Sequence, residues 1–599
     1  MKKAIISFLI LSIGIAVLIP SMLDGACQDS SLKMQGQEIK PPVKKIFPQG
    51  YFISPIQDSV FGIAGNFGEI RPNHFHAGLD VKTHGREGAY VLAAADGYVS
   101  RIKISPYGYG KCLYITHPNG FVSVYGHLQR LHGKVAEYLK QEQYKAETYD
   151  LDIYPEKNLL KVKQHDTVAI SGNTGGSQSP HVHFEIRDEI TEHAYNPFLF
   201  GFKIADTVPP RITTIAIYPA NDSSRVNGKD AMRKFGVAGG KGKYRVSAEA
   251  IPVHGDIGFG IETTDYGNVA AAGRLGAYSI ELDIDGKRIY YHELNEIGFD
   301  ESRYINSHID YAEEARSHKA IQKCFRDENN MLSIYQCVVN DGLFRFDDNA
   351  VHAVKFIVKD FFGNASTAEF KVKSTSTLAP FSLRRREGDE VHHFKCCDLN
   401  KFETDNIKVE IAPCTLYHDI DFDYSMSKDT LPGKFSPIHT VHKTDVPLNA
   451  NYSLSIKTKP VPDKLQSKAT IVLLDGKNEM KDQKGDYKDG WVTTDTRYFG
   501  RFAVAVDTVA PSIKPRNILN GSNLSHAKMI AVTIADNLTG IKTYRGTVDG
   551  KWIAMQFEYK NAMLFYEFDE HVTKGKHTFV LEVTDGKNNV RTYKADFVR

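Results

Sequence analysis

Cysteine is scarce in this chain, with seven residues in 599. Small secreted proteins that rely on disulfides instead of a hydrophobic core carry cysteine far more densely, so a disulfide-held scaffold is excluded. The chain also lacks a large excess of either charge: it has 74 Lys and Arg residues and 72 Asp and Glu residues, for a net charge of +2. Composition therefore gives no basis for nucleic acid as a partner, and we expect none.

Long apolar runs are absent after the N-terminus. The single run, from Ala4 to about Pro20, follows Lys2 and Lys3 and precedes a polar stretch. This order of basic, apolar and polar segments is typical of a secretory signal, and the run is shorter than the roughly 20 residues of a membrane span. We predict that residues 1–27 are a signal peptide, with an uncleaved N-terminal anchor as the alternative. The protein is then exported, to the periplasm or cell envelope.

Cys27 offers a second route to the membrane. It follows Leu23-Asp24-Gly25-Ala26, which resembles a lipoprotein box imperfectly because Asp24 fits such a box poorly. Export would also expose the cysteines to oxidation. Cys324 and Cys337 could close a small loop, although sequence alone does not fix the connectivity.

The length of the chain predicts several domains, because one hydrophobic core seldom supports 599 residues. The region from about Tyr51 to Phe200 is rich in glycine and contains short apolar or alternating runs between turn signals, which predicts antiparallel β structure. One helix is expected between Lys134 and Glu147, where apolar residues recur at positions i, i+3 and i+4.

Two pairs of similar strings mark the later domains. Asp206-Thr-Val-Pro-Pro210 and Asp507-Thr-Val-Ala-Pro511 each precede a β-branched stretch, and turns at 360–364 and 585–589 each precede an alternating run. This pattern resembles immunoglobulin-like sandwiches. We therefore predict a mainly β protein, with an antiparallel β domain at 48–205, a sandwich at 206–377, a β-rich domain at 378–506 and a second sandwich at 507–599.

The string His181-Val-His-Phe-Glu185 alternates polar and apolar residues, as a half-buried strand does. His181, His183 and Glu185 then share one face, with the two histidine backbones roughly 6.6 Å apart. One imidazole can bind a metal while the other addresses the water or substrate beside it. Glu185 is placed to orient the ligand histidine.

His76 and Asp80 form the other part of the predicted metal site. Ala77-Gly78 between strand-like flanks argues against a helix, and in a straight strand the pair would be about 13 Å apart. The chain must therefore bend between them, as Gly78 permits. Two histidine nitrogens and an aspartate oxygen suit Zn²⁺, and three protein ligands with one open position are typical of a catalytic zinc. His74 is the alternative first ligand.

Three ordered strings resemble the signatures of the M23, or lysostaphin-like, metallopeptidases over residues 50 to 200. They are His76-x-x-x-Asp80, Tyr125-x-His127-Leu128 and Pro180-His181-x-His183-Phe184-Glu185. The resemblance implies Zn²⁺ bound by His76, Asp80 and His183, catalytic roles for His127 and His181, and peptidoglycan peptide as the substrate. Ser179, where the family more often has Gly, and the long stretch 134–160 depart from the pattern and leave the substrate preference open.

The expected activity is that of an exported zinc metalloendopeptidase that cuts peptide stems or cross-bridges of peptidoglycan. Zinc polarises the scissile carbonyl and lowers the pKa of a bound water, the nucleophile. His181 is the candidate general base, and His127 would stabilise the oxyanion or protonate the leaving amine; the two histidines can also exchange these roles.

Two other interpretations compete with this one. In the first, the protein is a non-catalytic zinc-fold protein that binds peptidoglycan or regulates other cell-wall hydrolases. In the second, the enzyme is latent, and the segment Gln28 to Phe47 or a later domain covers the zinc. In the expected enzyme, the sandwich modules would position the protein, contact the wall or contact an envelope protein partner.

Overall fold

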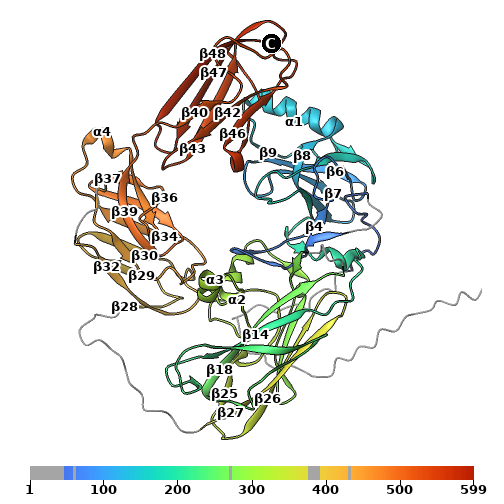
Figure 1. Cartoon of the computed structure of the whole chain (residues 1–599), viewed down its shortest axis with the longest axis vertical. Helices are drawn as coiled ribbons and strands as arrows, with labels where there is room; N and C mark the ends of the chain where they lie inside the picture. The colour runs from blue at the N-terminus through green and yellow to red at the C-terminus, as the bar shows by residue number, and fades with distance from the viewer. Residues whose placement is uncertain (1–45, 58–61, 269–272, 376–391, 429–432) are drawn as a thin grey trace, which may run out of the picture.

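The computed structural model describes residues 46–57, 62–268, 273–375, 392–428 and 433–599. The predicted signal peptide or anchor, with Cys27, lies outside these ranges, as does most of the segment Gln28 to Phe47. None of the helices within the described ranges has the length and apolar character that a membrane crossing requires. The predicted mainly β fold is confirmed: four β domains follow one another around a ring (Figure 1).

The first domain is built on an antiparallel sheet with the strand order β1-β4-β12-β8-β7-β6-β10. Its central strands β4 (Leu79–Lys82), β12 (His181–Asp188) and β8 (Phe121–Leu131) carry alternating side chains, and Val182 and Phe184 are fully buried in the core. One face of β12 is therefore apolar and the other is left for the histidines. The other elements are β1 (Ile63–Gly65), β2 (Ile70–Arg71), β3 (His74–Phe75), β5 (Tyr90–Leu92), β6 (Gly97–Ile104), β7 (Lys111–Thr116), β9 (Leu151–Ile153), β10 (Lys161–Val162), β11 (Thr167–Ser171), β13 (Ala194–Tyr195) and the 3₁₀ helix η1 (Pro197–Phe200).

The predicted helix in this domain is confirmed as α1 (Gly133–Ala146). Val135 and Leu139 are buried on its inner face against the domain core, as their spacing requires. The helix ends at Glu147, which adopts a left-handed conformation with φ of 47°. Its outer face points toward the last domain of the chain (Figure 1).

The second domain contains a 13-stranded sheet that folds around one hydrophobic core. A helical insertion lies between β22 and β23 and packs on the first domain. Cys324 is a buried free cysteine, so the loop between Cys324 and Cys337 is not closed by a disulfide as considered above. The elements are β14 (Arg211–Pro219), β15 (Arg225–Val226), β16 (Arg233–Gly240), β17 (Lys243–Val246), β18 (Ile251–Tyr266), β19 (Arg274–Leu275), β20 (Ser279–Ile284), β21 (Lys287–Glu293), β22 (Glu296–Ile297), η2 (Ser302–Tyr304), α2 (Ile305–His308), α3 (Tyr311–Ser317), β23 (Gln322–Lys323), β24 (Tyr335–Val338), η3 (Val339–Gly342), β25 (Phe344–Phe346), β26 (Val351–Lys359) and β27 (Ala365–Ser374).

The third domain has two five-stranded sheets, ordered β29-β30-β34-β38-β37 and β32-β33-β39-β35-β36, around a shared core. Alternating burial along β30 and β34 shows that each sheet has one apolar face. Its elements are β28 (His392–Phe394), β29 (Asn400–Glu403), β30 (Ile407–Ile411), β31 (Ile420–Phe422), β32 (Tyr424–Met426), β33 (His439–Val441), β34 (Tyr452–Lys457), α4 (Asp463–Gln466), β35 (Ala469–Leu474), β36 (Met480–Asp482), β37 (Asp486–Lys488), β38 (Trp491–Thr496) and β39 (Gly500–Val506).

The fourth domain also has two sheets around one core, ordered β40-β42-β46-β45 and β41-β48-β47-β43-β44. This is a two-layer β architecture; its immunoglobulin-like character stays a prediction. Its elements are β40 (Ser512–Pro515), β41 (Ser522–Asn523), β42 (Met529–Ala535), β43 (Ile541–Val548), β44 (Lys551–Trp552), β45 (Gln556–Glu558), η4 (Tyr559–Asn561), β46 (Met563–Glu567), β47 (Lys576–Asp585) and β48 (Val590–Val598).

The ring closes where the fourth domain meets α1 of the first. Tyr144 stacks on His571, with ring centroids 3.7 Å apart, and its hydroxyl donates to Asp569 over 2.7 Å. Further along this contact, Lys560 donates to the backbone carbonyls of Asn173 and Ser177 in the first domain. The first and last domains of the chain are therefore direct neighbours.

Candidate metal centre

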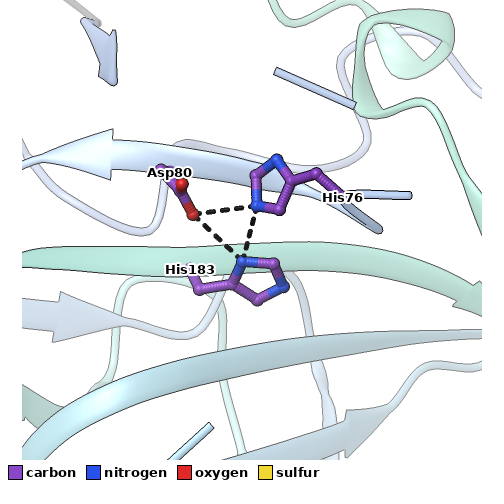
Figure 2. Close-up of side chains that lie close together, drawn as sticks. All are labelled: His76, Asp80 and His183. Atoms are coloured by element: carbon purple, nitrogen blue, oxygen red, sulfur yellow. Dashed lines mark hydrogen bonds and ion pairs between the residues drawn. The ribbon is translucent and has the colours of Figure 1, made fainter. Parts of the chain in front are cut away.

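Three side chains converge at one point on the polar face of the first sheet (Figure 2). Asp80 on β4 is paired in register with His183 on β12, while His76 approaches from the segment between β3 and β4. His76 Nε2 lies 2.9 Å from Asp80 Oδ1 and 2.9 Å from His183 Nδ1, and His183 Nδ1 lies 3.1 Å from Asp80 Oδ1. All three residues are buried. The structure thus brings together the three residues that the sequence proposed as ligands.

The chain bends at Gly78, between His76 and Asp80, and forms no helix there. The reason for glycine is close approach: a Cβ atom at Gly78 would lie 2.3 Å from the backbone oxygen of Phe184 on β12. Any larger residue would therefore push β4 away from β12 and separate Asp80 from His183. His74, the alternative ligand, is exposed on β3 and lies outside the cluster.

The donor atoms fit zinc. His76 Nδ1 lies 2.7 Å from the carbonyl of Asn66 and His183 Nε2 lies 2.7 Å from Glu185 Oε1, so in the neutral imidazoles these nitrogens donate and the other two present lone pairs. With Asp80 Oδ1, three lone-pair atoms then face one another at 2.9–3.1 Å. Ligand atoms about 2.0–2.1 Å from a tetrahedral zinc are separated by about 3.3 Å, close to this arrangement.

Charged groups behind these three residues hold this geometry. Arg71 donates to Asp80 Oδ2 over 2.9 Å, and Arg187 donates to Glu185 Oε2 over 2.5 Å. Burial disfavours the charged form of Glu185, but Arg187 and His183 outweigh burial and lower its pKa to about 2. Burial also opposes a charge on His183, yet Asp80 and Glu185 raise its pKa to about 9. The site therefore favours a positive charge, proton or metal ion, at His183 Nδ1.

The two candidate catalytic histidines flank the three ligands. His181 Nε2 lies 3.2 Å from Asp80 Oδ1, and the His127 and His181 ring centroids are 4.8 Å apart. His127 sits in a β-bulge of β8, where its φ of 59° is left-handed and turns the imidazole toward β12. Such a conformation in a residue with a side chain is costly and is kept only where the surrounding fold enforces it.

Backbone carbonyls set the tautomers of both histidines. His127 Nδ1 lies 2.8 Å from Thr174 O, and His181 Nδ1 lies 2.8 Å from Ser179 O. Each Nδ1 therefore donates, which leaves each Nε2 as a proton acceptor in the neutral ring. Burial, followed by the neighbouring His183 and His181, lowers the pKa of His127 to about 3. His127 is thus a neutral imidazole around pH 7.

Four supporting residues were not anticipated from the sequence. Tyr109 stacks on the His183 ring at 4.9 Å and donates to Glu185 over 2.5 Å, and Arg187 completes the Glu185 contacts. Arg187 continues the i+2 spacing of the strand, a signal that could have identified it. Asn66, Arg71 and Tyr109 come from turns and short strands whose side-chain directions follow no such period.

The described fold and site have the features of a metallopeptidase domain. Residues 74–152 match the model of peptidase family M23, and the first domain is an M23 peptidase domain. Residues 391–507 match the model of a Zu5-like domain, which corresponds to the third domain. The family match ends before His181 and His183; the sequence pattern proposed these two residues, and the structure places them beside Asp80.

Individual relatives are similar over part of the chain. An uncharacterized metalloprotease of Haemophilus influenzae is 31% identical over 134 residues, which cover 22% of this chain and 21% of that protein. The catalytic domain of the prophage-encoded M23 protein EnpA from Enterococcus faecalis is 24% identical and covers 25% of this chain and 98% of that domain, with a TM-score of 0.19. The catalytic domain of lysostaphin from Staphylococcus simulans is 22% identical and covers 23% and 92%, with a TM-score of 0.18.

Proposed function

We propose that this chain is an exported zinc metalloendopeptidase that hydrolyses peptide bonds in the stems or cross-bridges of peptidoglycan. The observation that carries the proposal is the convergence of His76, Asp80 and His183 beside two histidines whose Nδ1 atoms are engaged by backbone carbonyls. The M23 family match and the metalloprotease relative support the reaction class. The basic and apolar N-terminal segment supports export, to the periplasm or cell envelope.

His76, Asp80 and His183 would hold the zinc, which when bound polarises a peptide carbonyl and lowers the pKa of water. His181 is placed to take a proton from the attacking water at Nε2, because its Nδ1 is already engaged by Ser179 O. His127 Nε2 is equally unprotonated, so it would act only after receiving the proton that the attacking water gives up, by passing it to the leaving amine. In these tautomers the Nε2 atoms of His127 and His181 both accept protons, so neither is ready to donate a hydrogen bond to an oxyanion.

The test is cleavage of purified peptidoglycan by the zinc-loaded full chain and by His181→Ala. We expect the variant to lose about 10²- to 10⁴-fold in turnover, the range supplied by general acid–base catalysis. Its zinc content should be unchanged, because His181 is not a ligand. His74→Ala, an exposed neighbour outside the cluster, is the matched control and should retain full activity.

Mass analysis of the released fragments would name the bond that is cut. Peptide cross-links opened by wild type but not by His181→Ala would support the proposal. Binding of peptidoglycan by zinc-loaded wild type without any cleavage would instead favour a non-catalytic binding or regulatory protein. Equal cleavage by both proteins would contradict the mechanism.

A further inference from the structure

Two acidic clusters lie outside the peptidase site, one in the second domain and one in the fourth. In the second domain the cluster is Asp206, Asp265 and Asp360, and in the fourth it is Asp507, Asp536 and Asp585. In each cluster one oxygen from every aspartate lies within 4.8 Å of the others. Asp206 with Asp507, and Asp360 with Asp585, belong to the strings that repeat along the sequence, so the repetition preserves side-chain positions as well as a fold.

The cluster of the second domain joins three separate elements. Asp206 lies in the linker from the first domain, Asp265 near the end of β18, and Asp360 directly after β26. Asp265 is 2% exposed, and its Oδ1 has no hydrogen-bond partner among the described residues; the same holds for Asp206 Oδ2. Burial, followed by the charges of Asp360 and Asp206, raises the pKa of Asp265 to about 7. Buried carboxylate oxygens normally have partners, so a missing positive group is indicated.

One asparagine ties this cluster to the linker. Asn364 Nδ2 donates to Asp360 Oδ2 over 2.6 Å and to the backbone carbonyl of Asp206 over 3.3 Å. The backbone N–H of Val208 donates to Asp206 Oδ1 over 3.0 Å, whereas the buried Oδ2 has no hydrogen-bond partner among the described residues. The hydrogen bonds therefore fix the carboxylates in place without neutralising them.

The fourth domain repeats this arrangement. Asn589 Nδ2 donates to Asp585 Oδ2 over 2.7 Å and to the backbone carbonyl of Asp507 over 3.0 Å, and Val509 N–H donates to Asp507 Oδ1 over 3.2 Å. Asp536 follows β42 and again has a buried Oδ1 without a partner among the described residues. Asp507 and Asp585 are 1% and 0% exposed. Asp507 Oδ2 differs from Asp206 Oδ2 in accepting hydrogen bonds from the N–H and the hydroxyl of Thr539. Two domains separated by some 300 positions thus place three aspartates and one asparagine in matching positions.

We propose that each of these clusters binds one Ca²⁺ ion, and that the ion fastens the domain to the linker that precedes it. The donors are all oxygens, which suit a hard cation and not zinc, and three carboxylates in an irregular cage suit calcium, which accepts six to eight oxygen ligands in flexible geometry. Water would complete the coordination.

Cation binding at these sites would hold neighbouring domains together. Asp206 and Asp507 belong to linkers that contain no helix or strand, whereas their partners belong to the β framework. Next to the first site, Phe361 and Phe362 pack on Phe198 of the peptidase domain. A cation in each site would therefore hold the peptidase domain against the second domain, and the fourth domain against the third.

The test is calcium binding by the zinc-loaded full chain, measured by titration calorimetry. We expect two equivalents for wild type, one for Asp265→Asn, one for Asp536→Asn and none for the double variant. Asp230→Asn, an exposed aspartate in the second domain, is the matched control and should bind two. Absence of calcium binding by wild type, or unchanged binding by the double variant, would overturn the proposal.

Thermal unfolding gives a second measurement that does not depend on peptidase activity. With calcium, wild type should unfold at a higher temperature and the double variant should not respond. Without calcium, Asp265→Asn should unfold at the same or a higher temperature than wild type, because a repelled carboxylate is removed. A lower temperature there would count against the proposal, since it would make Asp265 a structural hydrogen-bonding residue.

Discussion

Single residues behind the candidate ligands decide how firmly the candidate metal site is held. Glu185 is fully buried and contacts His183, Tyr109 and Arg187 at once. Asn66 acts on the other ligand: its carbonyl orients His76, and its side chain exchanges two hydrogen bonds of 2.8 Å with the backbone of Gly276 in the second domain. The orientation of His76 therefore depends on a neighbouring domain.

Glu185→Gln is predicted to weaken zinc binding by about 10- to 100-fold, the usual cost of losing a group that orients a ligand histidine. It also leaves Arg187 buried without its charge partner, so the thermal unfolding temperature should fall. Competition with a chelator would measure the affinity. Glu189→Gln, exposed beyond the end of the same strand, is the control. Equal zinc affinity in both variants would show that Glu185 does not support the site.

Among the elements, the helical insertion of the second domain supports the strand segment before His76. Phe75 and Ala77 share a hydrophobic cluster with Ile305 and Ile309 around α2, and Phe75 N–H donates to Ser302 over 3.0 Å. His308 on α2 is fully buried and lies beside His292. Burial lowers the pKa of His308 to about 4 and that of His292 well below its ordinary value.

Acid is predicted to destabilise this contact. Below pH 6.5 the unfolded chain binds a proton at His308 that the folded chain does not. The contribution of neutral His308 to the free energy of unfolding is therefore fully present above pH 6.5 and is lost as the pH falls toward 4. The loss for this residue is about 3 kcal/mol. The groups around the ring are His292, Lys323, Gln322 and Tyr335. Calorimetry at pH 7 and pH 5 should show a smaller loss for His308→Gln than for wild type.

The exposed His526→Gln is the control for this series and should lose as much stability as wild type between the two pH values. If His308→Gln responded to acid as strongly as wild type does, other groups would carry the acid sensitivity. The role of α2 as a pH-dependent support of the metal site would then be excluded.

The elements differ in how much of their structure the sequence predicted. The period of two in His181-Val-His-Phe-Glu185 was enough to place three polar groups on one face of β12, and the spacing in 134–147 predicted α1 within one residue at each end. The bulge that turns His127 was not predictable, because it depends on pairing with β7. Gly78 was chosen for the bend on grounds of backbone freedom, whereas the structure gives close approach to β12 as the reason.

The molecule as a whole is a ring closed by contacts between residues more than 380 positions apart. Arg303 of the second domain donates to Leu448 O of the third over 3.0 Å, and Lys468 of the third donates to Lys587 O of the fourth over 2.6 Å. The contact of Tyr144 with His571 then returns to the first domain. Sequence patterns predicted several β domains but not this closure, because contacts between domain surfaces produce no periodic pattern of apolar residues in the sequence.

Tyr144→Ala is predicted to open the ring. The change removes the stacking on His571 and the hydrogen bond to Asp569 but touches no residue of the first-domain core. Small-angle scattering should show a larger radius of gyration for Tyr144→Ala than for wild type. Glu137→Ala, on an exposed position of the same helix, is the control. An unchanged radius in Tyr144→Ala would mean that the remaining contacts are sufficient to keep the ring closed.

The contact of Lys560 can form only late in the synthesis of the protein. Lys560 donates to Ser177 O over 3.0 Å, and the hydroxyl of Ser177 lies 3.3 Å from His181 Nδ1. Lys560 comes 383 positions after Ser177, so it is synthesised long after all five residues of the peptidase site. The loop beside His181, the proposed general base, therefore receives its last support only when the final domain has been translated and has docked.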